Sequence, residues 1–192
     1  MGKEWIKVKN IGQLYWEKTL VTFDFPVLFV CKDFENRKYL CLNIDDETGE
    51  TIIALTNNRY LIDMLIDKKP MDFVFKNALD NKITLVKYDD NNKIVSSVRE
   101  VNDVSKDLLP KEGEYFELHN KMLDEYIDFL KNQLLKLEYD KCFNNNIGVI
   151  SKLAFYSIND IDSLFERFFE KNFLEKNINY TYKISSKDEM IA

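Results

Sequence analysis

The stretch that decides the fold runs from Phe25 to Lys69. It begins with the apolar run FPVLFVC over 25–31, continues after a polar turn with RKYLCLNI over 37–44, and passes through an acidic turn to TIIAL over 51–55. Short apolar runs joined by tight polar turns are typical of antiparallel hairpins. A helix-like run over 58–69 follows and is available to cover one face. The stretch predicts an α+β fold, a mostly antiparallel meander with a covering helix.

The expected helix over 58–69 carries its own start and stop signals. Thr56 or Asn57 can cap the first free amide groups, and Pro70 ends the helix and restricts Lys69 as well. Its apolar residues recur at helical spacing; they are Leu61, Ile62, Leu65 and Ile66.

Further strands are expected on both sides of this stretch. A short strand over 5–8 and a longer extended segment over 14–25 precede it. Residues 71–78 form either a loop or a second short helix that tucks Phe73 and Phe75 under the sheet. After it, runs of β-forming residues over 83–88 and 93–101 flank Asp and Asn turn residues and predict a hairpin.

Pro110 and Gly113 make residues 103–114 the best candidate for a boundary between two lobes. The first lobe, 1–104, is the β-rich meander with one helix. The second, 105–192, reads as helix–strand–helix–strand, and the two lobes are either separate or packed as one continuous domain. The second lobe's elements are expected at 120–142, 149–156, 161–169 and 178–184.

The long helix over 120–142 begins at a capping Asn120 and carries apolar residues at alternating steps of four and three. This apolar stripe consists of Leu123, Ile127, Leu130, Leu134 and Leu137. It covers only about two heptads, whereas coiled coils need three or four. Packing within the chain is therefore favoured, and a partner helix or a homodimer through 120–142 is the alternative.

Composition limits the partners and the compartment. The chain has 33 acidic and 27 basic residues and a formal net charge of −6, which disfavours nucleic-acid binding because phosphate contacts need concentrated Lys and Arg. Three cysteines without a secretory leader indicate reduced thiols and a cytoplasmic protein. No apolar stretch approaches the length of a membrane span, so we expect no membrane association.

Residues 11–88 resemble a family of small, uncharacterised bacterial proteins known as a domain of unknown function. The resemblance rests on GQL at 12–14, FPVLF at 25–29 with Cys31, the acidic turn at 45–47, and the helix that ends near Leu65 and Ile66, followed by Phe75. It implies the fold of the amino-terminal lobe and no activity.

Candidate chemistry is sparse. His119 is the only histidine, and we expect it to be solvated near a helix start. Cys31 and Cys41 can face each other across a hairpin, but they lack the CxxC spacing of metal or redox pairs, so buried thiols are expected. Cys142 has no evident activating neighbour. The acidic turn Asp45, Asp46 and Glu47 departs from a calcium-loop pattern, and a hairpin turn in water is favoured over a weak divalent-metal site. No cofactor is expected.

Aromatic residues are abundant, and the candidates for an exposed binding cluster are Tyr15, Trp16, Tyr180 and Tyr182. We therefore interpret the chain first as a non-enzymatic module that binds another protein, as an accessory or inhibitory component linked to a mobile or phage-defence element. The alternative is a small-ligand sensor or metal-dependent enzyme that uses carboxylates. A concave pocket where these converge would favour the alternative.

Overall fold

The computed structural model describes residues 3–45, 47–89, 91 and 93–145. Contacts divide the chain between Glu138 and Tyr139, so the boundary expected between residues 104 and 105 lies inside the first unit. The strands expected at 149–156 and 178–184, and the helix at 161–169, lie outside the described residues. Within the described part, no helix combines the length and the apolar character needed to cross a bilayer.

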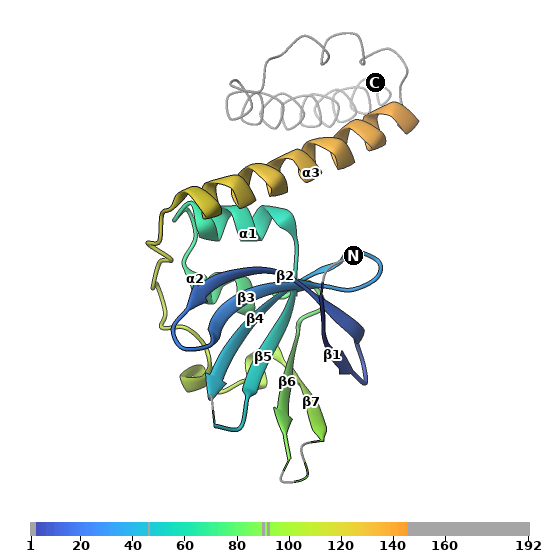
Figure 1. Ribbon diagram of the computed structural model, residues 1–192. Coiled ribbons are helices and arrows are strands. Elements are labelled where there is room, and N and C mark those ends of the chain that lie inside the picture. Colours follow the sequence, from blue (N-terminus) through green and yellow to red (C-terminus); the bar gives the residue numbers. More distant parts are fainter. Residues whose placement is uncertain (1–2, 46, 90, 92, 146–192) are drawn as a thin grey trace, which may run out of the picture. The chain divides into compact units, whose positions relative to one another are not determined.

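Among the described residues, seven strands form one antiparallel sheet in which the order across the sheet is the order along the chain (Figure 1). Their bounds are β1 (Glu4–Val8), β2 (Gly12–Thr22), β3 (Pro26–Lys32), β4 (Lys38–Asp45), β5 (Glu50–Thr56), β6 (Lys82–Tyr88) and β7 (Ile94–Glu100). The predicted α+β class with an antiparallel meander is confirmed.

The central strands are apolar on both faces because both faces are covered. On β4, Leu40 faces the helices, whereas its neighbours Tyr39 and Cys41 belong to a separate cluster on the opposite face. Strand residues alternate between faces, so a strand that is buried on both sides reads as a continuous apolar run.

Helix α1 (Asn58–Leu65) begins where Asn57 Oδ1 accepts a hydrogen bond of 2.8 Å from the amide of Tyr60. It ends at Leu65, four residues before the predicted end at Lys69. The chain turns at Asp67, whose φ is 56°, and the amides of Lys68 and Lys69 both donate to the carbonyl of Asp63. This left-handed turn satisfies a free carbonyl at the helix end and leaves Ile66 44% exposed.

Helix α2 (Met71–Lys76) confirms the second short helix and follows Pro70 directly. Phe75 is fully buried in the core under the sheet, as expected. Phe73 is only half-buried and lies edge-on against Tyr60, with ring centroids 5.3 Å apart. The chain continues through short 3-10 turns at Val101–Asp103 and Lys106–Leu108.

Helix α3 (Lys121–Asn145) begins with Asn120, whose Oδ1 accepts a hydrogen bond from the amide of Leu123. Leu123, Ile127 and Leu130 are buried in the same core as β3, β4 and α1, and Leu134 packs against that core. The preferred prediction of packing within the chain is confirmed for these four residues of the apolar stripe. Leu137, the fifth, is 52% exposed.

The opposite face of the sheet is partly covered by the chain's own first hairpin. Register shifts interrupt the pairing of β2 with β3 after Trp16, Thr19 and Val21, and such bulges bend and twist a strand. The β1–β2 hairpin consequently curls over the face (Figure 1), and Asn10 Nδ2 donates a 3.2 Å hydrogen bond to Thr84 Oγ1 on β6. Ile6, Val8 and Leu14 are thereby buried.

Candidate functional site

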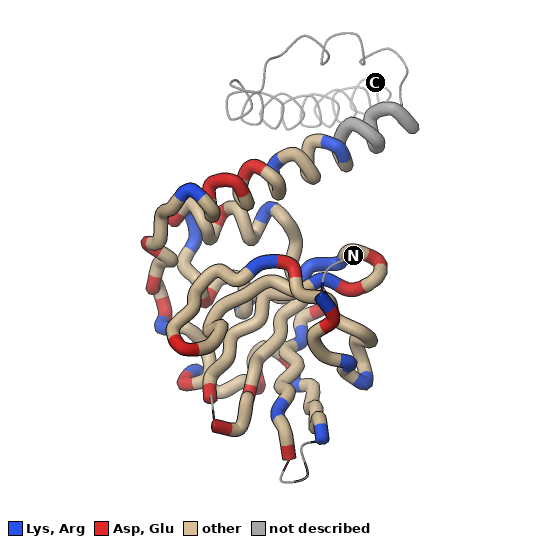
Figure 2. The backbone as a smooth tube through the Cα atoms, in the orientation of Figure 1, with Lys and Arg blue, Asp and Glu red and all other residues tan. Residues whose placement is uncertain are grey.

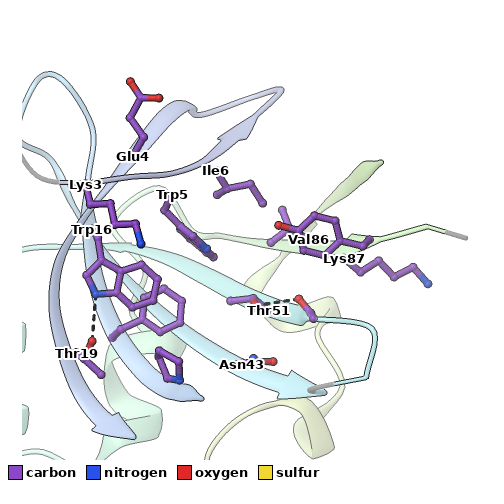
Figure 3. Close-up of a pocket in the computed structure, with 14 residues that line it drawn as sticks. Lys3, Glu4, Trp5, Ile6, Trp16, Thr19, Asn43, Thr51, Val86 and Lys87 are labelled. Carbon is purple, nitrogen blue, oxygen red and sulfur yellow. Dashed lines mark hydrogen bonds between the residues drawn. The ribbon is translucent and has the colours of Figure 1, made fainter. Parts of the chain in front are cut away.

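A cavity of about 690 Å³ opens on the part of this face that the hairpin leaves uncovered. Its wall includes residues of all of the first six strands (Figure 3). It is therefore a product of the curl of the sheet, because β1 contributes one wall only after it has crossed over the other strands.

Three aromatic side chains build one side of the cavity. Trp16 stacks on Phe29 with centroids 4.2 Å apart and an interplanar angle of 8°. Trp5 meets Phe29 edge-on at 4.9 Å and Trp16 at 5.9 Å, with both angles 89°. Trp16 Nε1 donates to Thr19 Oγ1 at 3.1 Å, which fixes the indole plane. Stacked and edge-on pairs are favourable aromatic arrangements, so the wall is pre-formed.

The floor of the cavity carries one unsatisfied acceptor. Asn43 Oδ1 on β4 is inaccessible to solvent and has no hydrogen-bond partner among the described residues. Neighbouring Thr51 is satisfied, since its hydroxyl donates to the carbonyl of Gly49 at 3.2 Å. A buried carbonyl oxygen without a donor costs about 1–3 kcal/mol, so a donor at this position would be stabilising.

Charged residues lie at the mouth of the cavity. In Figure 3 the ammonium end of Lys3 reaches toward the aromatic wall, while Glu4 and Lys87 point away from it. The main chain of Lys3 is held in place because its carbonyl accepts a 2.7 Å hydrogen bond from the amide of Trp16. The cavity mouth therefore has a local excess of positive charge.

Apolar surface continues from the cavity to the edge of the sheet. Tyr88 lines the cavity and pairs with Ile94, while Val98 pairs with Thr84 on the same face. Tyr88, Ile94 and Val98 are 45%, 42% and 44% exposed. Gly49 allows the Tyr88 ring to pass over the β4–β5 turn: its φ is 63°, and a Cβ there would meet the ring at 3.1 Å.

A second group of buried polar side chains joins α3 to the sheet. Glu17 on β2 forms a salt bridge with Lys38 and accepts a 2.7 Å hydrogen bond from the Tyr126 hydroxyl. Burial lowers the pKa of Lys38, although Glu17 partly offsets the effect. Burial, reinforced by the Glu17 carboxylate, raises the pKa of Tyr126 well above its usual value. These groups fix the position of α3 and face away from the cavity.

Of the two residues of the predicted aromatic cluster that the structure describes, Trp16 lines the cavity and Tyr15 does not. Tyr15 is half-buried and points to the other side of β2, opposite Lys32 in the register with β3. Tyr180 and Tyr182 lie outside the described residues. Trp5, Phe29 and Asn43 also line the cavity and were not among the residues predicted from the sequence. The signal available in the sequence was Asn43 itself. It is a polar residue at the same two-residue spacing as Tyr39 and Cys41, and so lies on the same, otherwise apolar, face of the strand.

The acidic turn has the features of an ordinary hairpin turn. Asp45 accepts hydrogen bonds from the amide of Glu47 at 3.0 Å and the hydroxyl of Thr48 at 2.7 Å. The Thr48 hydroxyl is the main reason that the pKa of Asp45 is lowered. Asp46 lies outside the described residues, and within those residues no three His, Cys, Asp or Glu side chains gather as a metal site. Neither Asp45 nor Glu47 lines the cavity.

The other candidate side chains that the structure describes, those of Cys31, Cys41 and His119, do not line the cavity. Cys31 and Cys41 are free thiols with no exposed area, as predicted; they are offset across the hairpin, where Cys31 pairs with Tyr39. Burial raises the pKa of Cys41 well above its ordinary value. The His119 side chain is 63% exposed, and its Nε2 lies 3.0 Å from Asp67 Oδ2. Cys142 lies on α3, and its side chain is outside the described part.

Charges of both signs are interspersed along the described chain (Figure 2). Comparison with protein-family models, curated proteins and solved structures finds no match to the chain. The class that fold and site define is an α+β protein with a curled antiparallel sheet and an aromatic-walled cavity.

Proposed function

We propose that the protein is an interaction module that binds another protein along β7, the last strand of the sheet in the described part of the chain. The observation that carries the proposal is the exposure of Ile94, Val95 and Val98 on this edge strand, at 42%, 45% and 44%. The proposal concerns binding and assigns no chemical step. An accessory or inhibitory component of a mobile or phage-defence element is one role for such a module, and it stays a prediction.

The two edges of the sheet differ in how they are protected. β1 is short, carries a register shift between Glu4 and Ile6, and buries Ile6 and Val8. β7 pairs with β6 over seven consecutive residues without a shift. Bulges and short length protect an edge from pairing, whereas a long, regular and apolar edge invites another strand. β7 is thus the edge suited to receive a partner.

The chemistry of β7 specifies the partner segment. Ile94, Ser96 and Val98 lie on the cavity face, and Val95 and Arg99 lie on the helix face. A strand added to this edge would place its side chains beside these on alternate faces. The matching segment is extended, carries apolar residues on both faces, and has a carboxylate beside Arg99.

The test introduces charge on the edge without disturbing the core. We expect the double variant Val95→Lys, Val98→Lys to lower affinity for the partner by about tenfold or more, because lysine on an edge strand opposes pairing. The partner is first captured from the native host at physiological salt and identified by mass spectrometry. Purified partner is then titrated by calorimetry.

The control is Phe23→Lys, which places one lysine at a larger apolar residue that is 78% exposed outside the strands. It should bind as the wild type does. Equal binding by the edge variant and the control would refute the role of β7. A concentration-dependent doubling of mass in sedimentation, abolished by the edge variant, would show that the edge pairs with a second copy instead.

A further inference from the structure

The geometry points to the cavity as a binding site for a small aromatic acid that also carries an N–H or O–H donor. This inference goes beyond the proposed protein partner, and it rests on different residues. The cavity is formed by the curl of β1 and β2 over the sheet, and none of its lining residues belongs to β7, the strand proposed to bind a protein.

The size and walls of the cavity favour a small, flat ligand. Its volume, 690 Å³, falls within the range of about 300–1,000 Å³ found for small-molecule sites. Such sites are mostly apolar with a few polar groups that orient the ligand. Here the apolar part is the rigid group of Trp5, Trp16 and Phe29, against which an aromatic ring can stack or lie edge-on.

The floor selects for a donor. Asn43 Oδ1 lacks a partner among the described residues, and the hydroxyl of Thr51 beside it is already committed to Gly49. A ligand N–H or O–H would satisfy this oxygen once rotation of the half-buried Asn43 side chain brings it to the cavity surface. A ligand of the same shape without the donor would leave it unsatisfied, and sites that hydrogen-bond a ligand discriminate strongly against analogues that lack the group.

The mouth selects for an anion. Lys3 Nζ has no ion-pair partner in the described part of the chain, and its side chain reaches toward the aromatic wall (Figure 3). Trp5 Nε1 has no acceptor there either. A carboxylate between an ammonium and an indole N–H would accept charge-assisted hydrogen bonds. Glu4 points away and would not repel it.

The sequence offers a direct readout of occupancy. The chain has two tryptophans, Trp5 and Trp16, and both line the cavity. Their indole N–H groups give two resolved signals in a ¹H–¹⁵N spectrum of the full chain. The probe is indole-3-acetate, which has an aromatic body, an N–H donor and a carboxylate. We expect it to shift both signals in a saturable manner.

Two analogues and two variants separate the contributions. Naphthalene-1-acetate lacks the donor and tryptamine lacks the carboxylate, and each should bind about tenfold more weakly or worse. Asn43→Ala should remove the preference for indole over naphthalene, and Lys3→Gln should remove the preference for acid over amine. Asn102→Ala and Lys9→Gln, at exposed positions away from the cavity, are the controls and should change neither preference.

The outcomes are decisive and independent of the β7 proposal. Indole signals that stay unshifted at millimolar probe would overturn the inference, as would equal affinity for all three probes or preferences that survive in both variants. Because Lys3 is exposed, Lys3→Gln should fold normally. It therefore tests the preference for an acid even if Asn43→Ala folds poorly. The edge variant Val95→Lys, Val98→Lys should bind the probe as the wild type does.

Discussion

At the scale of single residues, three buried polar side chains join α3 to the sheet: those of Glu17, Lys38 and Tyr126. Their burial costs desolvation free energy, which their mutual contacts offset. The side chains of Glu17 and Lys38 are 8% and 5% exposed, and Tyr126 is 6% exposed. A buried pair is strongly destabilising when one partner is lost, because the other charge is left uncompensated. The hydroxyl of Tyr126 belongs to this arrangement, since it donates to the second oxygen of Glu17.

Tyr126 should make the protein sensitive to alkaline pH. Its pKa in the folded chain is raised by burial and by Glu17, so above about pH 10 the unfolded chain loses a proton that the folded chain keeps. The stabilisation is complete below pH 10 and falls as pH rises, by up to about 1.4 kcal/mol per pH unit for this one proton. Tyr126→Phe should flatten the fall measured by urea unfolding from pH 8 to 11.

The same variant should lose about 1.5–3 kcal/mol at neutral pH, because a hydrogen bond to a charged group is removed. Tyr115→Phe, at a ring that is 42% exposed, is the matched control and should follow the wild-type profile. A Tyr126→Phe profile as steep as that of the wild type would contradict the assignment of this titration.

At the scale of elements, the apolar stripe of α3 shows how one helix divides its contacts. Leu123, Ile127 and Leu130 enter the core, and Leu137 at the far end of the stripe is half exposed. A homodimer that used this stripe would first have to detach the helix from the sheet. Replacing leucine by alanine should therefore lower the free energy of unfolding more at a buried position of the stripe than at an exposed one.

Leu130→Ala should lower the free energy of unfolding by about 2–5 kcal/mol, because it removes a fully buried side chain and leaves a cavity. Leu137→Ala is the matched control and should stay within about 0.5 kcal/mol of the wild type. Urea unfolding followed by circular dichroism measures both. Equal losses would mean that Leu137 is as buried in solution as Leu130.

Local sequence patterns predicted which helices and strands form better than they predicted the residue at which each one ends. The hairpins, α1 and α2 follow from apolar spacing and from Pro and Asn signals near the residues themselves. The early end of α1 did not follow, because the turn at Asp67 is stabilised by backbone groups that any residue possesses. A left-handed turn at Asp is tolerated but leaves little compositional trace.

The cavity was harder to predict than the strands that form it. Trp16 was a candidate because it is aromatic, but Trp5 and Phe29 join it only through the bend of β2 and the crossing of β1. These contacts depend on bulges, which sequence periodicity does not reveal. Asn43 could be found only once its strand face was known to be apolar.

At the scale of the whole molecule, the apolar clusters on the two faces of the sheet should unfold together in one cooperative step. Cys31 and Cys41 lie in the cluster under the curled hairpin and have no exposed area. In a Cys142→Ser background we expect both thiols to react with a disulfide reagent only through global unfolding. Leu130→Ala alters the core on the other face of the sheet. In this variant the rate of thiol labelling should rise about 30-fold or more, which is the factor that corresponds to a loss of about 2 kcal/mol in the free energy of unfolding.

The labelling is followed by absorbance and compared with the unfolding constant of each variant. Leu137→Ala serves again as the control and should label at the wild-type rate. Rapid labelling that ignores Leu130→Ala would show instead that the β1–β2 hairpin lifts by itself, and the hairpin would then be a separately opening unit.

The order of the strands has a consequence for synthesis of the chain. Each strand pairs with its immediate predecessor, so the sheet can grow hairpin by hairpin as it leaves the ribosome. The α3 side chains that share a core with Leu28 and Leu40 are synthesised much later, at Leu123 to Leu130. The part of the sheet that α3 covers is therefore exposed on the nascent chain until α3 has been synthesised, and such exposed apolar surface is what chaperones bind.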